Sequence, residues 1–320
     1  MKLVKFILVS ILSIVLAVSL TACGSNADKT AAVSGDKEVV RLAYLPITHA
    51  LPVFEAAKEA AEKNDSLQIE LIKYGSWPEL MDALNTGRVD GASVLIELAV
   101  KAKEQGIDLK GVALGHRDGN VIVVSKDINN AADLKGKTIA IPHRQSSHNI
   151  LVQEMLKKAG LSLEDVKIVE LAPPEMPSAL TQKQIAAYCV AEPFGAKAVA
   201  LDSGKILYKS EELWPDSACC ALVLNGKFLK NKSEIAKKLV KNYGEAGKTL
   251  GSEPAELQNI AAEYLKQDKK VLDLSLQWIS YDNLGITEDI YSVLTDKMKE
   301  FGLSDAPPAY NDFVDNTLLF

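Results

Sequence analysis

Residues 142–149 read Pro-His-Arg-Gln-Ser-Ser-His-Asn and concentrate side chains that form hydrogen bonds. The stretch lies between an apolar run at 138–141 and an amphipathic run at 148–159 that is typical of a helix. Ser146 or Ser147 can cap that helix, whose first turn also presents free backbone N–H groups and a partial positive charge. Because an anionic oxygen can bind to both, the stretch predicts either a simple helix cap or a cap that also grips a ligand.

The chain has four histidines, and the strand and helix pattern places each of them in a loop that follows a strand. They are His49, His116, His143 and His148. A histidine that is protonated or donates a hydrogen bond suits an oxyanion, whereas several neutral imidazoles together with Glu192 suit a transition metal. Since their spacing is not a compact metal motif, only the fold could assemble such a metal site.

Other kinds of chemistry find little support in the sequence. It contains no Gly-x-Ser-x-Gly elbow, no His-Glu-x-x-His and no glycine-rich phosphate loop, so we expect no enzyme activity. The formal net charge of -6 argues against a nucleic-acid partner. Apart from Cys23, the cysteines are Cys189, Cys219 and Cys220, which have no Cys-x-x-Cys spacing. We interpret these three as small apolar core residues and not as a disulfide framework.

Strand and helix patterns alternate from residue 39 onward, which is typical of α/β proteins with mostly parallel sheets. The pattern restarts after Asn120, and a return strand near 221–224 precedes a mostly helical C-terminal segment. We therefore predict two α/β lobes, one inserted into the other. The lobes are residues 39–122 with 222–320, and residues 123–221. Ligands bind outside the carboxyl ends of strands in such sheets, so a cleft between the lobes is the expected site.

The N-terminal residues predict an extracytoplasmic protein. Two lysines precede the apolar run 6–20, which is too short for a typical membrane span. The sequence Leu20-Thr21-Ala22-Cys23 resembles the lipobox of bacterial lipoproteins, in which the cysteine is lipidated. Residues 1–22 are then a signal peptide, and 23–38 form a flexible tether of small polar residues. The expected location is the outer face of the cell membrane, with the lipid as anchor.

Several segments resemble the substrate-binding proteins of the nitrate/sulfonate/taurine (bicarbonate) ABC importer family. They are Arg41-Leu42-Ala43-Tyr44-Leu45-Pro46-Ile47-Thr48-His49-Ala50, Ala83-Leu84-Asn85-Thr86-Gly87-Arg88-Val89-Asp90, Asp133-Leu134-Lys135-Gly136-Lys137-Thr138-Ile139-Ala140, Pro173-Pro174-Glu175-Met176, Tyr188-Cys189-Val190-Ala191-Glu192-Pro193-Phe194 and Cys219-Cys220-Ala221-Leu222-Val223-Leu224. Residues 182–187 depart from the pattern, because they lack the Gly and Asp that relatives often carry there. The resemblance implies a two-lobed periplasmic-binding-protein-like (type II) fold with helices flanking each sheet.

The resemblance also implies a function. A receptor of this family captures a small solute by hinge closure and delivers it to a membrane permease with its ATPase subunit. Sulfonate, taurine, nitrate or bicarbonate is the leading ligand class. The alternatives are a transition metal or metal–ligand complex held by histidines, and an aromatic thiamine-precursor-like compound that Trp77 and Tyr44 would suit. We expect a monomer that requires no cofactor, unless Zn or another divalent metal binds the histidines.

The resemblance, together with the strand ends, selects the expected ligand-binding residues. These are Thr48, His49, Trp77, Ser93, His116, Gln145, Ser146, Ser147, His148 and Glu192. Trp77 is open to two interpretations, an apolar wall of the site or a hydrophobic staple before its helix. Ser93 is expected at the end of a strand. A carboxylate at Glu192 would repel a simple anion but could accept a hydrogen bond from an amine or help to bind a cation.

Overall fold

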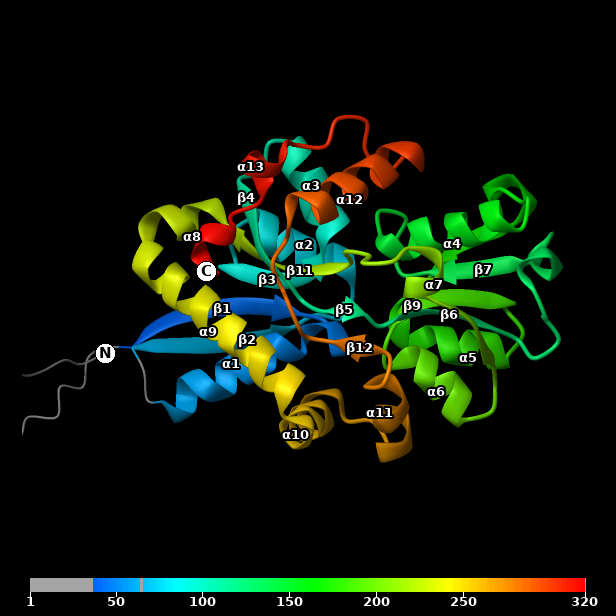
Figure 1. Cartoon of the computed structure of the whole chain (residues 1–320), viewed down its shortest axis with the longest axis horizontal. Helices are drawn as coiled ribbons and strands as arrows, with labels where there is room; N and C mark the ends of the chain where they lie inside the picture. Colours follow the sequence, from blue (N-terminus) through cyan, green and yellow to red (C-terminus); the bar gives the residue numbers. More distant parts are fainter. Residues whose placement is uncertain (1–36, 64–65, 320) are drawn as a thin grey trace, which may run out of the picture. The chain divides into compact units, whose positions relative to one another are not determined.

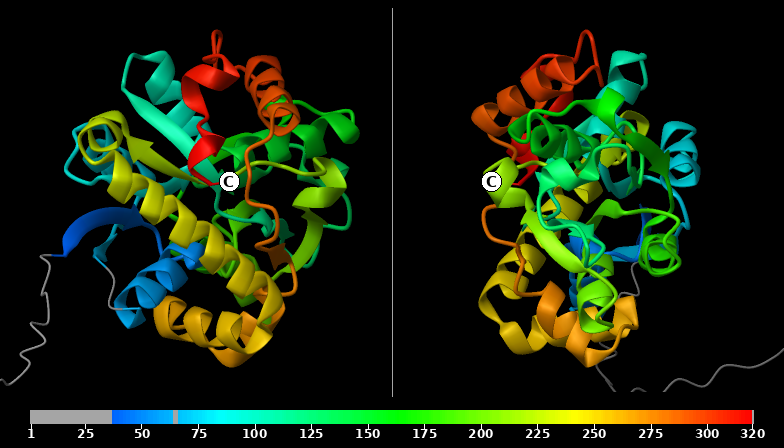
Figure 2. Two further views of the ribbon diagram at one scale, coloured as in Figure 1. Left: turned by 60° about the vertical axis from the view of Figure 1, so that its left-hand side comes forward. Right: turned by 90° about the vertical axis from the view of Figure 1, so that its right-hand side faces the viewer.

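A computed structural model describes residues 37–63 and 66–319 as one compact unit. The predicted signal peptide, the lipidation site Cys23 and nearly all of the tether lie outside these residues. Glu38, which the sequence assigns to the tether, is the first residue of strand β1 (Glu38–Tyr44). Figures 1 and 2 show an α/β architecture in which helices flank two separate sheets, as the sequence predicts.

The first sheet has the strand order β2-β1-β3-β11-β4. Besides β1 its strands are β2 (Leu67–Lys73), β3 (Gly91–Leu95), β11 (Cys220–Asn225) and β4 (Leu109–Leu114). Strand β1 runs parallel to β2 and β3, whereas β11 runs antiparallel to both β3 and β4. Because β3 and β11 are buried along their whole length, they read in the sequence as nearly continuous apolar runs.

The second sheet repeats this plan with the strand order β10-β6-β9-β7-β8. Its strands are β10 (Lys205–Lys209), β6 (Asn120–Val124), β9 (Ala187–Ala191), β7 (Thr138–Ile141) and β8 (Lys167–Glu170). Strand β7 runs parallel to β8 and β9, and β6 runs antiparallel to β9 and β10. Each sheet is therefore mixed, because one strand runs antiparallel to the direction of the other four. We call each sheet, with the helices on its faces, a lobe.

Helices cover both sheets. Those of the first lobe are α1 (Leu51–Glu62), α2 (Trp77–Asn85), α3 (Ile96–Glu104), α8 (Gly226–Asn231), α9 (Ser233–Ser252), α10 (Pro254–Leu265), α12 (Glu288–Glu300) and α13 (Tyr310–Phe313). Those of the second are α4 (Ser147–Lys158), α5 (Met176–Thr181), α6 (Phe194–Ala200) and α7 (Ser210–Leu213). The 3-10 turns are η1 (Thr48–Ala50), η2 (Ala131–Leu134), η3 (Leu163–Asp165), η4 (Pro173–Glu175) and η5 (Asn316–Leu318). The long helix α9 packs against α1 (Figures 1 and 2).

The chain crosses between the lobes twice, after β4 and before β11. Residues 120–122, assigned to the first lobe from sequence, pair with β9 in the second sheet. Residues 220–221, assigned to the second lobe, begin β11 in the first sheet. A third connection is the pairing of β12 (Ile279–Ser280) with β5 (Arg117–Asp118), which lies in the first crossing. Helix α11 (Lys269–Ser275) also packs on α6 of the second lobe.

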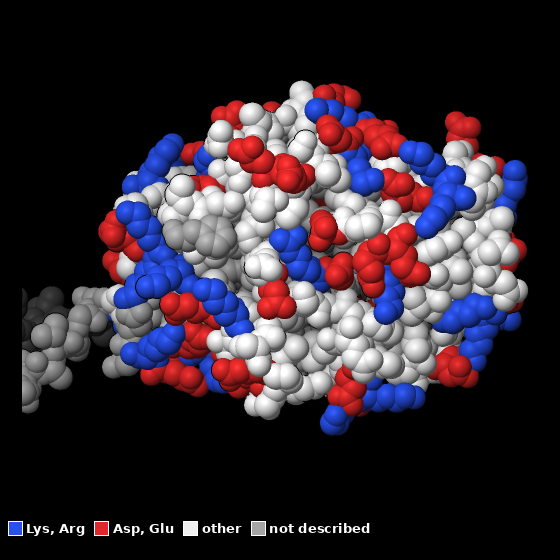
Figure 3. All heavy atoms as spheres, in the orientation of Figure 1, with Lys and Arg blue, Asp and Glu red and all other residues white. Residues whose placement is uncertain are grey.

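The surface carries charges of both signs. Lysine and arginine side chains are interspersed with aspartate and glutamate over the face that Figure 3 shows. This distribution agrees with the absence of a basic stripe in the sequence. Among residues 37–63 and 66–319, no helix combines the length and the apolar character that a membrane span requires.

Candidate ligand site between the two lobes

The first lobe brings three segments together at one edge of its sheet. His49 lies in η1 directly after β1, and His116 follows β4. Cys219 precedes β11, whose antiparallel direction brings its start to the edge where β1 and β4 end. All three side chains are at most 1% exposed. The fold thus assembles histidines that lie far apart in the sequence, and it adds a thiol that we had interpreted as ordinary core.

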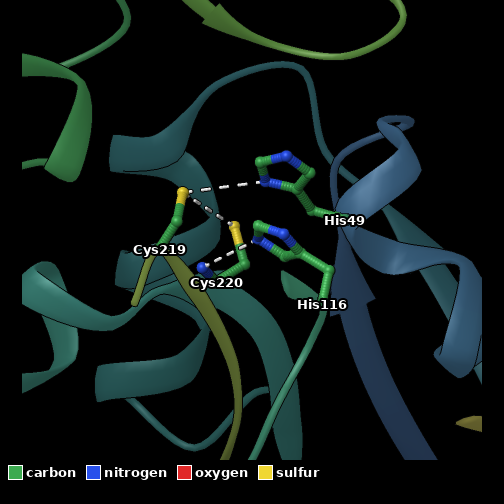
Figure 4. Close-up of side chains that lie close together, drawn as sticks. All are labelled: His49, His116, Cys219 and Cys220. Carbon is green, nitrogen blue, oxygen red and sulfur yellow. Dashed lines mark hydrogen bonds between the residues drawn. The ribbon is translucent and has the colours of Figure 1, made fainter. Parts of the chain in front are cut away.

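Figure 4 shows how His49, His116, Cys219 and Cys220 converge. The two imidazole rings stack, with their centroids 3.5 Å apart and an interplanar angle of 23°. The Sγ atom of Cys219 lies 3.7 Å from Nδ1 of His49 and 3.9 Å from Sγ of Cys220. One candidate ligand atom from each residue lies within 4.8 Å of all the others. This donor set of imidazole nitrogen and thiol sulfur fits zinc-like ions.

Backbone contacts fix the tautomer of each ring. Nε2 of His49 lies 3.1 Å from the carbonyl oxygen of Gly119, which can only accept a hydrogen bond. Nε2 therefore carries the proton, and Nδ1 presents its lone pair to Cys219. Nε2 of His116 instead accepts from the backbone N–H of Cys220 at 3.3 Å, so the neutral ring carries its proton on Nδ1. That Nδ1 has no hydrogen-bond partner among the described residues.

Burial sets the charge of this cluster. It lowers the pKa of His116 to about 4, and the charge of His49 acts in the same direction. For the Cys219 thiol burial alone would raise the pKa. The hydrogen bond with Cys220 and the neighbouring histidines outweigh burial and hold that pKa well below its ordinary value. Burial raises the pKa of Cys220, so this second thiol stays protonated. The cluster favours a thiolate at Cys219 and a protonated thiol at Cys220.

The second lobe contributes the start of α4. Ser146 is the N-cap: its Oγ accepts from the N–H of Asn149 at 3.2 Å and donates to the carbonyl oxygen of His143 at 2.6 Å. The next two residues, Ser147 and His148, are at most 1% exposed. In the described part of the chain, neither Ser147 Oγ nor either ring nitrogen of His148 has a hydrogen-bond partner. Burial lowers the pKa of His148 to about 4, so its ring is neutral. Ser146 therefore caps the helix, while the side chains of its two neighbours are buried without a hydrogen-bond partner in the described chain.

Two carboxyl groups are fully buried near these residues. Oε2 of Glu192, directly after β9, accepts from the N–H of Ala196 at 2.9 Å, and burial raises the pKa of Glu192 to about 8. The group is protonated at neutral pH, so the expected repulsion of an anion does not arise. Burial also raises the pKa of Glu97, on α3, well above its ordinary value, and the adjacent Ser147 opposes that shift. The sequence analysis missed Glu97, because the local sequence does not show that this acid is buried.

The remaining predicted residues have varied surroundings. Thr48 ties the lobes together, because its N–H and its hydroxyl both donate to the carbonyl oxygen of Glu192, at 2.9 and 3.0 Å. Trp77 is 2% exposed and begins α2 within the hydrophobic core. Ser93 lies in the middle of β3 opposite Leu222, and the expectation of a strand end there was wrong because β3 begins and ends two residues later. Gln145 is half-buried, and its backbone N–H donates to Nδ1 of His143.

Surface hollows show where the lobes meet. A groove of 560 Å³ is lined from both lobes, but it contains none of the predicted ligand-binding residues. Its lining includes Tyr44 and Lys73 from the first lobe, and Phe194 and Lys197 from the second. A larger hollow of 810 Å³ lies at the opposite strand ends of the second lobe, near Thr138, and contains none of the predicted site residues. The polar residues described above therefore mark the site better than the size of a hollow.

Several known proteins are similar to this chain in sequence and in fold. Residues 34–265 match the NMT1-like family. A zinc-bound ligand-binding component of an ABC-type import system from Staphylococcus aureus is 38% identical, with a TM-score of 0.85 over 88% of this chain and 98% of that chain. A putative aliphatic sulfonates-binding protein of Bacillus subtilis is 25% identical, over 94% of this chain and 92% of its own length. The periplasmic nitrate-binding protein NrtA of Synechocystis shares the fold, at 16% identity and a TM-score of 0.78 over 88% of this chain and 87% of its own.

Other relatives are matched over less of their length. The chain spans 29% of a nitrate import ATP-binding protein of Synechocystis and 63% of a putative aliphatic sulfonates-binding protein of Escherichia coli. The matched family model nevertheless covers most of this chain, and the Staphylococcus aureus protein matches over almost its whole length. The resemblance found in the sequence is confirmed, and the chain belongs to the NMT1-like family, among relatives that are binding proteins for nitrate and sulfonate import.

Proposed function

We propose that this chain is the extracytoplasmic solute receptor of an ABC importer, and that it binds a small oxyanion such as a sulfonate, taurine, nitrate or bicarbonate between its lobes. Closure of the lobes about the two crossings would present the loaded receptor to a permease and its ATPase subunit. A lipid on Cys23 would keep the receptor, as a monomer, at the outer face of the membrane. Binding without turnover agrees with relatives that are named as binding proteins.

The observation that carries this proposal is a group of buried polar atoms that both lobes contribute and that have no hydrogen-bond partner among the described residues. His116 Nδ1 comes from the first lobe, and Ser147 Oγ and the His148 ring come from the second. None of these atoms has a partner within residues 37–63 and 66–319. Buried polar groups are nearly always hydrogen-bonded, and an unpaired one costs about 1–3 kcal/mol. A small polar ligand between the lobes would satisfy them.

The protonation states favour acceptor oxygens on that ligand. His116 offers an N–H, Ser147 an O–H, and neutral His148 one N–H. The protonated carboxyl of Glu192 offers a further donor. The first turn of α4 adds backbone N–H groups and the positive end of a helix dipole. Lys73 and Lys197 at the groove would attract an anion from solution.

A second candidate ligand is a transition metal or a metal–ligand complex. The convergence of two histidines and two cysteines within 4.8 Å favours it. A metal at this place would be either the cargo or an aid to its capture. The aromatic alternative gains no comparable support, since Tyr44 packs edge-on against Phe54 with ring centroids 4.7 Å apart and Trp77 lies in the core.

The test is thermal unfolding of the full chain, purified in detergent and freed of metal with a chelator. Sulfonates, taurine, nitrate and bicarbonate would be added one at a time. A ligand at 100 times its dissociation constant should stabilise the folded state by about 2.7 kcal/mol. The shift should disappear in His148→Ala and Ser147→Ala. It should persist in Ser275→Ala, which changes a buried serine on α11 outside the site. Equal shifts in all three variants would refute the site.

A further inference from the structure

The interlobe site poses a problem of charge. Among the described residues, no lysine or arginine is buried, so an anion bound between the lobes meets backbone dipoles and side-chain donors but no lysine or arginine charge. Next to these donors lies a thiol that faces the lone pair of an imidazole. We propose that His49, Cys219 and His148 together bind one divalent transition-metal ion with the ligand preference of zinc, and that a fourth coordination position receives an oxygen of the anionic solute. The proposal deepens the proposed receptor function and rests on it.

The first-lobe half of this metal site already has suitable geometry. Zinc binds imidazole nitrogen at about 2.0 Å and thiolate sulfur at about 2.3 Å, so a tetrahedral angle places the two ligand atoms about 3.6 Å apart. Nδ1 of His49 and Sγ of Cys219 are 3.7 Å apart. Nε2–H of His49 donates to the carbonyl oxygen of Gly119, which is the outer contact that metal-bound histidines usually make. One ion could therefore bind both atoms with little movement.

The second-lobe half is His148. It is 1% exposed, and both of its ring nitrogens are without a partner among the described residues. The pKa of His148 is affected by the charges of Cys219, His49 and His116, so the ring lies near these residues, outside the group of four whose ligand atoms lie within 4.8 Å of one another, and closure of the lobes would bring it to the ion. Because His148 lies on α4, an ion shared with His49 and Cys219 would link the two lobes directly. Such an ion would favour the closed arrangement over the open one.

The other two residues of the cluster, His116 and Cys220, are not ligands of the proposed ion. Nε2 of His116 accepts from the backbone N–H of Cys220, and the proton on Nδ1 makes that nitrogen a donor, suited to an oxygen at the fourth position. The Cys220 thiol lies 3.9 Å from Cys219 and can donate to it. Only one thiolate is needed. A divalent ion with one thiolate and two neutral imidazoles keeps a charge of about +1, which a monovalent anion would neutralise.

Spectroscopy with Co²⁺ tests the ligand set without any transport assay. The full chain in detergent would be stripped with a chelator and titrated with Co²⁺, then with Zn²⁺. The ion binds Cys219 as a thiolate, and any proton still on that sulfur passes to solvent. The titration should give one equivalent of bound ion, with a thiolate-to-cobalt absorption band and intense visible bands typical of four-coordinate cobalt. Nitrate or a sulfonate should alter the visible bands, because its oxygen enters the coordination sphere.

Variants distinguish the ligands from their neighbours. Cys219→Ser should abolish the thiolate band, and His49→Gln and His148→Gln should weaken Co²⁺ binding by at least about tenfold. Cys220→Ser and Cys189→Ser should keep the band. Cys189 is the matched control, a buried cysteine on β9 of the second lobe. The melting temperature of each variant without metal would show that it folds.

The outcomes separate this inference from the receptor function. If Co²⁺ does not bind the wild-type chain, or if the band survives in Cys219→Ser but not in Cys220→Ser, the proposed ligand set is wrong. If an anion still raises the melting temperature of the chelated chain while metal has no effect, the receptor function stands and the metal does not. If neither an anion nor a metal shifts the melting temperature, both proposals fail.

Discussion

Replacing Glu192 by glutamine should change how the stability of the protein depends on pH. The carboxyl is fully buried, and burial raises its pKa from 4.5 to about 8. Glutamine has nearly the same shape as the protonated acid, so its amide oxygen can still accept from the N–H of Ala196. The substitution removes the titration and leaves the contact in place.

The direction and size of this pH dependence follow from the difference in proton binding between the folded and unfolded states. Because the folded state binds this proton more tightly than the unfolded state, the stabilisation is fully present below about pH 4.5 and is lost as the pH rises through about 8. A shift of about 3.5 pKa units corresponds to an upper limit of about 5 kcal/mol, at 1.36 kcal/mol per unit. Between about pH 6.5 and pH 8, this one group should lower the wild-type free energy of unfolding by about 2 kcal/mol.

Other buried groups have to be separated from Glu192. His116 and His148, whose pKa values are lowered to about 4, contribute in the opposite direction. Their contribution is present above about pH 6.5 and is lost as the pH falls from there toward 4. Above pH 6.5, acids with raised pKa values lower the free energy of unfolding as the pH rises, and the Cys219 thiol, whose pKa is lowered, acts in the opposite direction. Comparing variant with wild type at each pH removes the contributions that both share.

The assay is urea unfolding of the full chain at several pH values between about 6.5 and 8.5, with free energies obtained by linear extrapolation. As the pH rises over this range, the free energy of unfolding of Glu192→Gln should fall by about 2 kcal/mol less than that of the wild type. Glu62→Gln, at an exposed position on α1, should behave as wild type. If Glu192→Gln follows the wild-type pH dependence, the carboxyl is ionised in the folded protein, and the argument that it tolerates an anion is refuted.

Three further predictions concern contacts around the same site. Gly195→Ala should destabilise the fold by about 1–3 kcal/mol in urea unfolding, because a β-carbon there would lie 2.5 Å from Oε1 of Glu192 and would also contact Val121. Unchanged stability would show that the neighbouring side chains can move to make room. Ser146→Ala should cost about 1 kcal/mol through loss of the α4 cap but leave anion affinity unchanged in calorimetry, whereas a large loss of affinity would make Ser146 a ligand contact. Thr48→Val should lower the free energy of unfolding by about 1 kcal/mol, since it removes the hydroxyl that donates to the Glu192 carbonyl. It should also favour the open arrangement of the lobes, measured by small-angle scattering. Identical scattering from variant and wild type would argue against a role of this contact in closure.

The helices and strands could be predicted from the sequence more reliably than the set of residues that comes together at the candidate site. The cap at Ser146 could be predicted because local backbone chemistry determines it. The end of β3 was misplaced by two residues, since a continuous apolar run does not mark its own boundaries. The thiol of Cys219 could not be assigned to the site from spacing, because 170 residues separate it from His49 and only the strand order brings them together. Glu97 was missed because local patterns do not show whether an acid is buried.

The two crossings between the lobes have a consequence for how the affinity of this receptor can change. His116 lies in the first crossing and Cys219 in the second, so residues of the proposed site also belong to the segments about which the lobes would turn. Apparent affinity is the intrinsic affinity scaled by the fraction of molecules in the binding-competent form. A substitution in either crossing that shifts this equilibrium by about 1.4 kcal/mol would change affinity about tenfold without altering a ligand contact. Under the proposed function, the same short stretches of chain would therefore set both the contacts with the solute and the readiness of the lobes to close.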